Sequence, residues 1–475
     1  MFGAKVSQRQ FAVGHGGFHA GRIKIVQSRR GLTTSSLSSK SNNVTTVLDQ
    51  VYVYDCGSEH FGAYKSALNA FRMEYAERFE VLFVSHLHAD HINGIDKLLG
   101  YKVPRIVVLP YLDLEDVAST ALHDFDAGDF SATYREYIRD PIAWWHDHGV
   151  DSVIFIEPGN DDGGTAPISP LPDRPIEGES LSPGEWDYER PQARLAAVLK
   201  TPALPPPPDL EAASPTPFDL DAPKLGRGAV LAGSGSLFRA EWKYDRRDTW
   251  RSADWCLVPY VNPVQDAQRT AFRTAILAHL GLTNPTPIEF RKRVLDELAS
   301  ASQSRALMDI YSDHFGHNHN AVSMSLYSGP AYSRPPNVHN ALGDAQNWEN
   351  ETKSLHGYRI RRNPMSASGW LSTGDSMLKQ RKRRGPWKEF YSRFQQSIRT
   401  LTLPHHGSNH NFDDEILAWD KLHFALVTTV PSEVRVAGIE KTLQSVAAQG
   451  KIGLVVDDQP GSSVFSISRR LFSAL

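Results

Sequence analysis

The stretch SHLHADH, residues 85–91, follows directly on the apolar run FEVLFV, residues 79–84. Within six residues it carries three imidazoles and one carboxylate, at His86, His88, Asp90 and His91. Imidazole nitrogen and carboxylate oxygen are donors with which proteins hold zinc, iron, manganese or nickel. Without such a partner, four polar groups beside a buried strand would be costly to desolvate. The stretch therefore predicts a metal site at the end of a core strand.

Strand-like and helix-like segments alternate on both sides of this stretch. Residues 44–54, VTTVLDQVYVY, are β-branched and aromatic and predict a strand that ends at Asp55. Further strand-like runs lie at residues 103–109, 152–157, 255–261, 321–327, 369–372, 398–403, 423–430 and 452–456. Helical patterns separate several of them, as at residues 61–79 and 92–99. The alternation predicts an α/β protein with a layered sheet, opened by a hairpin at residues 11–26.

The middle of the chain has a different composition. Residues 158–223 contain DDGGTAP, four consecutive prolines and SPTP, and predict an exposed, partly disordered insertion. Residues 267–282 and 287–298 show helical patterns that predict a small helical subdomain. We expect a first half of the core at residues 1–157, the Pro-rich insertion at 158–223, an insert with the helical subdomain at 224–317, and the second half of the core at 318–475.

The motif HLHADH resembles the HxHxDH signature of the metallo-β-lactamase fold, whose members hold one or two metals between the sheets of an αββα sandwich. Asp55 in VYVYDCGS resembles the aspartate that ends an early strand of this fold, which implies a supporting role. Asp375 in WLSTGDSM resembles the aspartate that bridges two metals. His405 and His406 in TLPHHGS resemble the late histidine ligand. The resemblance implies an αββα core that carries the Pro-rich insertion and the helical insert.

The late motifs indicate a branch of this superfamily. PHHGS at residues 404–408, the upstream GD and VGHG at residues 13–16 resemble the hydrolase domain of the ComEC-type DNA-uptake proteins and its relatives. The third superfamily motif, usually a lone histidine, is left open. Three histidines lie in the expected interval: His314, His317 and His319. NAVSMS at residues 320–325 instead resembles the Asn/Ser pattern of the ComEC-like branch.

The resemblance also implies the chemistry of the site. The implied metal ligands are His86, His88, Asp90, His91, Asp375, His405 and His406. The expected metal is zinc, as two ions, with manganese as an alternative. A metal-bound hydroxide would attack phosphorus or a carbonyl carbon. Asp90, together with whichever of His405 and His406 does not ligate, is expected to transfer protons.

Other candidate residues have simpler interpretations. His15 and His19 lie in the first hairpin and are expected to be solvated. His146 and His148 lie at a helix end, where they would cap carbonyl groups. Cys56 is expected to pack in the core.

The substrate prediction is a metal-dependent phosphodiesterase or nuclease that acts on nucleic acid or nucleotides. It depends on the ComEC-like motifs and on the only dense basic run, LKQRKRR, whose five cationic residues are Lys379, Arg381, Lys382, Arg383 and Arg384. Such a run could follow a phosphate backbone, or it could be a solvated loop. Two alternatives are a hydrolase of a small ester, lactam or thioester, and a degenerate scaffold in a larger complex. The inserts could also recruit a protein partner.

Composition excludes several classes of function. Lys+Arg 51 against Asp+Glu 54 gives a formal net charge of -3, so the chain as a whole has no attraction for nucleic acid or anionic membranes. Two cysteines cannot form a disulfide scaffold, and MFGAKVSQRQ has no apolar signal core, which predicts a cytoplasmic protein. The apolar runs are far shorter than the roughly 20 residues of a membrane span.

Overall fold

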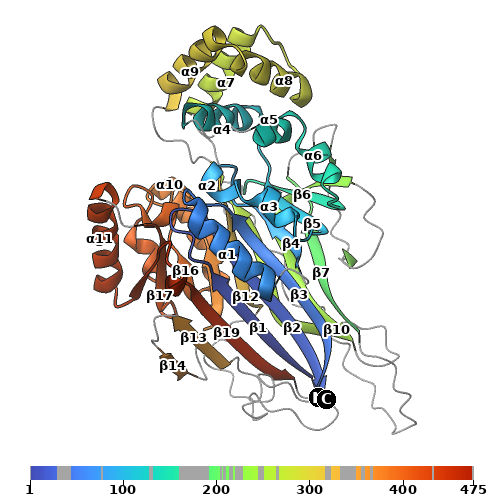
Figure 1. Ribbon diagram of the computed structural model, residues 1–475, viewed down its shortest axis with the longest axis vertical. Helices are drawn as coiled ribbons and strands as arrows, with labels where there is room; N and C mark the ends of the chain where they lie inside the picture. Colours follow the sequence, from blue (N-terminus) through green and yellow to red (C-terminus); the bar gives the residue numbers. More distant parts are fainter. Residues whose placement is uncertain are drawn as a thin grey trace.

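The computed structural model describes residues 2–28, 44–75, 79–127, 132–159, 192–203, 206, 210–212, 218–219, 228–243, 251–263, 267–315, 322–331, 349–354, 359–363, 367–430 and 433–472. The protein is mixed α/β, with a large sheet and helices packed on it (Figure 1). The α/β class predicted from the sequence is confirmed.

The N-terminal strands form the first part of the sheet. β1 (Phe2–Gln10), β2 (Phe18–Ser28) and β3 (Val44–Cys56) pair antiparallel, and β3, β4 (Phe79–Phe83), β5 (Ile106–Pro110) and β6 (Ser152–Glu157) pair parallel. The crossovers carry α1 (Phe61–Glu74), α2 (Ala89–Ile92), α3 (Ile95–Leu99), α4 (Leu114–Ala127), α5 (Ala132–Arg139) and α6 (Pro141–Asp147). β5 and β6 are buried along their whole length, as expected of parallel strands covered on both faces.

The remaining strands continue this sheet through β10 (Gly228–Lys243). β10 pairs parallel with β6 and, further along, antiparallel with β7 (Gln192–Lys200) and β11 (Arg251–Val261). Next come β12 (Met324–Pro330), β15 (Gly369–Ser372), β16 (Ile398–Thr402), β17 (Phe424–Thr428) and β18 (Ile452–Val456). β19 (Val464–Phe472) pairs with β1 and with β13 (Glu349–Ser354), which pairs with β14 (Arg359–Asn363).

Short elements complete the description. β8 (Glu211–Ala212) pairs with β10, and β9 (Phe218–Asp219) pairs with β7. α10 (Arg381–Tyr391) and α11 (Glu433–Ala448) connect β15 to β16 and β17 to β18. Single 3-10 turns are η3 (Ser392–Phe394), η4 (His405–Gly407), η5 (Asp414–Leu417) and η6 (Pro460–Ser462).

Side chains on the two faces of β3 and β4 have different partners. On one face the ring centroid of Phe83 lies 5.3 Å from that of Phe238 in β10, and the Tyr54 hydroxyl donates to the Met324 carbonyl over 2.6 Å. On the other face Val53 packs in a core that includes α1. This alternation follows from the two-residue period of a strand. It places the loop after β4 at the edge of both cores.

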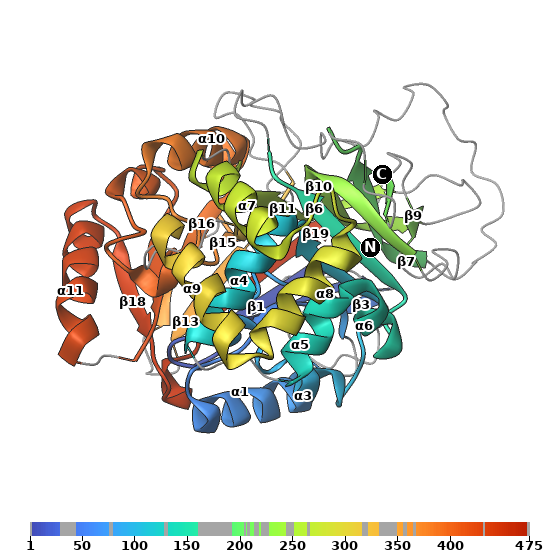
Figure 2. The same ribbon diagram turned by 90° about the horizontal axis from the view of Figure 1, so that it is seen from above.

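The helical body is formed by α4 together with α7 (Ala267–Leu280), α8 (Pro287–Leu298) and α9 (Ala301–Phe315) (Figure 2). α7 and α8 lie where the sequence predicted helices. α9 was not predicted, because its buried Leu307 and Tyr311 lie in a stretch whose other residues are largely polar. α4 belongs to an earlier part of the chain, so the body combines two distant segments. No helix among the described residues is long and apolar enough to cross a membrane.

Two expectations about the strands need correction. The first arm of the hairpin is β1, and residues 11–17 form the turn, because polar residues in AKVSQRQ concealed a strand whose Ala4 and Val6 are buried. Within residues 158–223, which were predicted to be exposed, β7 pairs with β10 and buries Leu195 and Leu199. The surrounding prolines masked this apolar strand. Residues 160–191 lie outside the described residues.

Candidate metal centre

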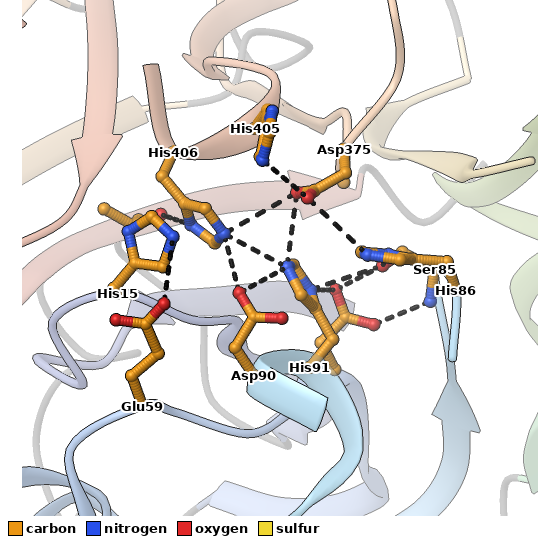
Figure 3. A network of polar contacts seen from close by, with 12 residues as sticks. His15, Glu59, Ser85, His86, Asp90, His91, Asp375, His405 and His406 are labelled. Atoms are coloured by element: carbon orange, nitrogen blue, oxygen red, sulfur yellow. Dashed lines mark hydrogen bonds and ion pairs between the residues drawn. The ribbon is translucent and has the colours of Figure 1, made fainter. Parts of the chain in front are cut away.

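Polar side chains from the ends of several strands meet in one buried cluster (Figure 3). Asp55 lies near the end of β3, residues 85–91 follow β4, Asp375 follows β15, and His405 and His406 follow β16. Because these strands end at the same edge, segments far apart in the sequence come together. The Nε2 atoms of His91 and His406, 315 positions apart, lie 3.4 Å from each other.

Three imidazoles of the cluster are held by contacts at Nδ1. His86 Nδ1 lies 2.9 Å from the hydroxyl of the neighbouring Ser85. His91 Nδ1 lies 2.9 Å from Asp55 Oδ2, and His406 Nδ1 lies 3.1 Å from Thr428 Oγ1. Contacts of this kind fix the orientation of metal-binding histidines and direct the second nitrogen toward the ion.

The separations between the inward-facing atoms suit shared ions. His91 Nε2 lies 3.2 Å from Asp375 Oδ1, and His86 Nε2 lies 3.6 Å from Asp375 Oδ2. His406 Nε2 lies 2.9 Å from Asp90 Oδ2. Two ligands at zinc distances from one tetrahedral ion are roughly 3.3–3.6 Å apart. The side chains are thus already spaced as ligands, apart from the closer hydrogen-bonding pair of His406 and Asp90.

The buried Nε2 atom of His86 is a second feature that fits a bound metal ion. His86 is only 3% exposed, and its Nε2 has no hydrogen-bond partner among the described residues. A buried nitrogen in this state is costly unless another partner, such as a cation, is bound. Asp375 shares ligand-distance groups with His86 and His88 on one side and with His91 and His406 on the other. The buried His/Asp groups could therefore hold metal ions.

Burial and charge set the protonation of these groups. Burial lowers the pKa of His86 to about 4 and that of His88 well below its ordinary value. Both are neutral at pH 7, which is the form that binds metal. Burial also acts to lower the pKa of His91, but the carboxylates of Asp90 and Asp375 outweigh it and raise this pKa well above its ordinary value. A cation and a proton therefore compete for His91.

Backbone geometry at the centre is unusual. Asp55, His405 and His406 have left-handed φ angles of 59°, 49° and 57°. Such conformations cost of order 1–3 kcal/mol each in residues other than glycine. The Asp55 carboxylate is held by the Ser85 backbone N–H at 2.6 Å and by the Ser85 hydroxyl at 2.7 Å, in addition to His91. These bonds offset the local strain.

The loop before Asp375 depends on close packing. Gly374 has a φ of +52°, and a Cβ there would lie 2.4 Å from the Ser323 hydroxyl oxygen. The Ser323 hydroxyl accepts a hydrogen bond from the Asp375 N–H at 3.0 Å. Ser323 belongs to NAVSMS, the stretch considered for the third motif. Its side chain contacts the loop that carries the bridging candidate.

The two adjacent histidines occupy different positions. His406 is 4% exposed, and its Nε2 points into the cluster. The side chain of His405 is 37% exposed, and its Nε2 lies 3.6 Å from Asp375 Oδ2 at the rim. Of the third-motif histidines, His314 is on α9, with Nδ1 2.8 Å from the Ile310 carbonyl oxygen and outside the cluster. The other two, His317 and His319, lie outside the described residues.

Four polar residues near the centre were missed or misjudged from the sequence. His15 is not solvated: its ring centroid is 3.9 Å from that of His406, and burial lowers its pKa to about 2. His19 is also buried, with its ring centroid 4.6 Å from that of Trp370. The other two, His123 and Asp124 on α4, lie beside His88. VGHG was the only sequence signal for His15, and no spacing rule pointed to α4.

The simpler interpretations of three other residues are confirmed. His146 Nδ1 lies 2.9 Å from the Val150 carbonyl oxygen, and His148 Nδ1 lies 2.8 Å from the Trp144 carbonyl oxygen. Cys56 is fully buried. These side chains belong to the structure of the fold.

The basic run is only partly a surface feature. It begins α10, where Arg383 and Arg384 are each 6% exposed. Arg384 forms ion pairs with Asp413 at 2.8 Å and Glu415 at 3.1 Å. Lys379 donates to the Asn409 carbonyl at 2.6 Å. The expectation of five residues along a phosphate backbone is wrong for the two buried arginines, because the apolar side of α10 carries them inward.

We therefore expect Arg384→Gln to destabilise the fold. The change removes the ion pair of the buried guanidinium with Asp413 and its solvent-screened ion pair with the exposed Glu415, and it also removes donors to the Leu378 and Lys379 carbonyls. The matched Arg381→Gln change, at an exposed position of the same helix, should alter the free energy of unfolding by less than about 0.5 kcal/mol. Urea unfolding followed by circular dichroism measures both. Equal midpoints for the two variants would show that the Arg384 ion pairs add no stability.

A cationic depression adjoins the cluster. It has a volume of about 470 Å³ and is lined by His15, His405 and His406 together with Arg435 and Lys441. Both nitrogens of the Arg435 fork lie 3.0 Å from the carboxylate oxygens of Glu59. The depression thus leads from exposed cationic groups to the rim of the metal cluster.

No family model matches the sequence, and no curated protein matches it. Among solved structures, a long-form RNase Z from yeast matches with 15% identity and a TM-score of 0.15. The match covers 22% of this chain and only 14% of that chain. A similarity this short establishes neither the fold nor the activity.

Proposed function

We propose that the protein is a metal-dependent hydrolase of phosphodiesters, with nucleic acid or a nucleotide as substrate. The observation that carries this proposal is the position of Asp375, whose carboxylate lies between two groups of buried imidazoles. A carboxylate shared in this way is the arrangement that a pair of hydrolytic metal ions needs. The motif resemblance to the ComEC-like branch is consistent with it.

The proposed fold is a metallo-β-lactamase-like αββα sandwich. The contacts of Phe83 with Phe238 and of Tyr54 with Met324 support it, because they join opposed strands across a common core. The residue order of the motifs along the chain also agrees. We propose further that residues 1–157 and 318–475 form the two halves of this core, and that the intervening segment adds the strands β7, β10 and β11, the last two of which join β6 to β12.

The proposed metal ions are zinc. One would be held by His86, His88 and Asp375, and the other by Asp90, His91, His406 and Asp375. Ions at these positions would activate water at neutral pH and stabilise negative charge that develops on the substrate.

The neighbouring side chains would orient a ligand, donate a proton and attract the substrate. Asp55 holds His91 in the orientation that directs Nε2 inward. His405, at the rim beside the cationic depression, is placed to give a proton to a leaving oxygen. Lys441 would attract the anionic phosphate into that depression, beside Arg435, whose charge Glu59 offsets. A phosphodiester therefore suits the surroundings better than a neutral ester.

The test combines metal analysis with hydrolysis assays on the purified protein. We expect bound transition metal, and turnover of bis-p-nitrophenyl phosphate that stops with chelator and returns with zinc or manganese. Labelled single-stranded RNA and DNA should then be cleaved. Absence of metal would favour a scaffold. Turnover of a carboxylic ester, lactam or thioester in the absence of phosphodiester cleavage would favour a small-molecule hydrolase.

A further inference from the structure

α4 connects the helical body to the metal cluster. Its Ala118 and Leu122 are buried in the core of the helical body. Val117, by contrast, packs in the core that contains Val53 of β3 and residues of α1. In Figure 1 the helix lies between α2 and the helices α7 to α9. The side of α4 that meets the strands is therefore close to the residues that follow β4.

Two polar side chains of α4 reach His88. The ring centroid of His123 lies 4.5 Å from that of His88, with the ring planes at 36°. One ligand atom from each of His88, His123 and Asp124 lies within 4.8 Å of the others. Asp124 is 3% exposed. His88 thus belongs both to this group and to the group with His86 and Asp375.

We propose that His123 and Asp124 bind a metal ion together with His88, so that the helical body contributes ligands to the centre. This inference rests on the proposed function, since it extends the same cluster. Because His88 is shared, His123 and Asp124 would add an imidazole and a carboxylate, both zinc donors, to the ligands of the ion proposed at His86, His88 and Asp375. His314, one candidate for the third-motif histidine, lies outside the cluster. His123 on α4 instead places a further imidazole beside His88.

The helix that carries these ligands is anchored. Near its start, Arg269 of α7 contacts Asp113 at 2.9 Å and pairs with Asp116. The Asp113 carboxylate also accepts a hydrogen bond from the Asp116 N–H at 3.1 Å. Ligands on a rigid helix are held more accurately than ligands on a loop. The Arg269 contacts therefore hold the start of α4 in place, and with it the helix that carries His123 and Asp124.

The test compares His123→Ala and Asp124→Asn with His314→Ala, a matched half-buried histidine on α9. Zinc content after dialysis and zinc affinity against a chromophoric chelator are measured on the full chain. Loss of a supporting contact weakens metal affinity by roughly 10–100-fold. A ligand role predicts loss of one ion, or a weakening beyond about 100-fold at one site. His123→Cys should restore binding, because a thiolate also ligates zinc.

Wild-type zinc content and affinity in His123→Ala and Asp124→Asn would overturn the inference, and so would a loss confined to the 10–100-fold range. Circular dichroism of the metal-free variants shows whether they fold. If His123→Ala does not fold, Asp124→Asn provides the test of zinc binding. The two proposals fail in different ways. A wild-type protein without metal refutes both, whereas metal that depends on His86 but not on His123 refutes only this one.

Discussion

Asp375→Asn is expected to abolish phosphodiester turnover while the protein stays folded. The Asp375 carboxylate is within ligand distance of imidazoles on both sides of the centre, and an amide replaces one of its oxygens with an NH₂ group that cannot ligate. Loss of metal-based charge stabilisation costs several kcal/mol, so kcat should fall by at least roughly 10³-fold. Steady-state kinetics in metal-saturated buffer measure the loss, and circular dichroism checks the fold.

Asp55→Asn is the matched control for this prediction. Asp55 is a buried strand-end aspartate as well, but it contacts His91 through Nδ1, on the side away from the cluster. Its loss should weaken metal affinity by roughly 10–100-fold and leave turnover measurable at saturating metal. If Asp375→Asn retained wild-type kcat, Asp375 would not be the shared ligand.

The double variant His86→Ala and His88→Ala is expected to lose at least one metal ion per chain. Both imidazoles are buried and neutral at pH 7, and with Asp375 they form one of the ligand-distance groups. Without them that group keeps a single carboxylate, which is too few donors for a structural or catalytic zinc site. Metal content by elemental analysis measures the change.

The chain contains a natural control for the double variant. His146 and His148 have the same spacing, but their Nδ1 atoms donate to backbone carbonyls at and after the end of α6. Replacing both with Ala should leave the metal content unchanged. Unchanged metal in the His86 and His88 variant would instead refute the assignment of the HLHADH stretch.

Much of the fold could be predicted because local pattern and burial agree. FEVLFV is a buried strand, and the helices predicted at residues 267–282 and 287–298 correspond to α7 and α8. The cluster could also be anticipated, since His86, His91, Asp375 and His406 each lie just beyond a strand end. Dense motifs at strand ends are informative because parallel strands bring such ends together.

Other features depend on contacts that no local pattern records. β1 and β7 were missed because their burial comes from strands distant in the sequence. Arg384 lies in a basic run that predicts a surface charge, but in the structure it is buried and paired with Asp413. His123 occurs in an ordinary amphipathic helix, and only the packing of α4 on two cores brings it to His88. Spacing along the chain cannot reveal a neighbour from a different element.

The left-handed backbone at Asp55, His405 and His406 limits how this protein could be made more robust. Glycine adopts such angles without steric strain, so a search for heat-resistant variants of the metal-free chain would tend to favour glycine at the partly exposed His405 position. That variant would tolerate heat better and would lack the side chain at the rim of the centre. Selection for stability of the metal-free chain and selection for the proposed chemistry would therefore favour different residues at this turn.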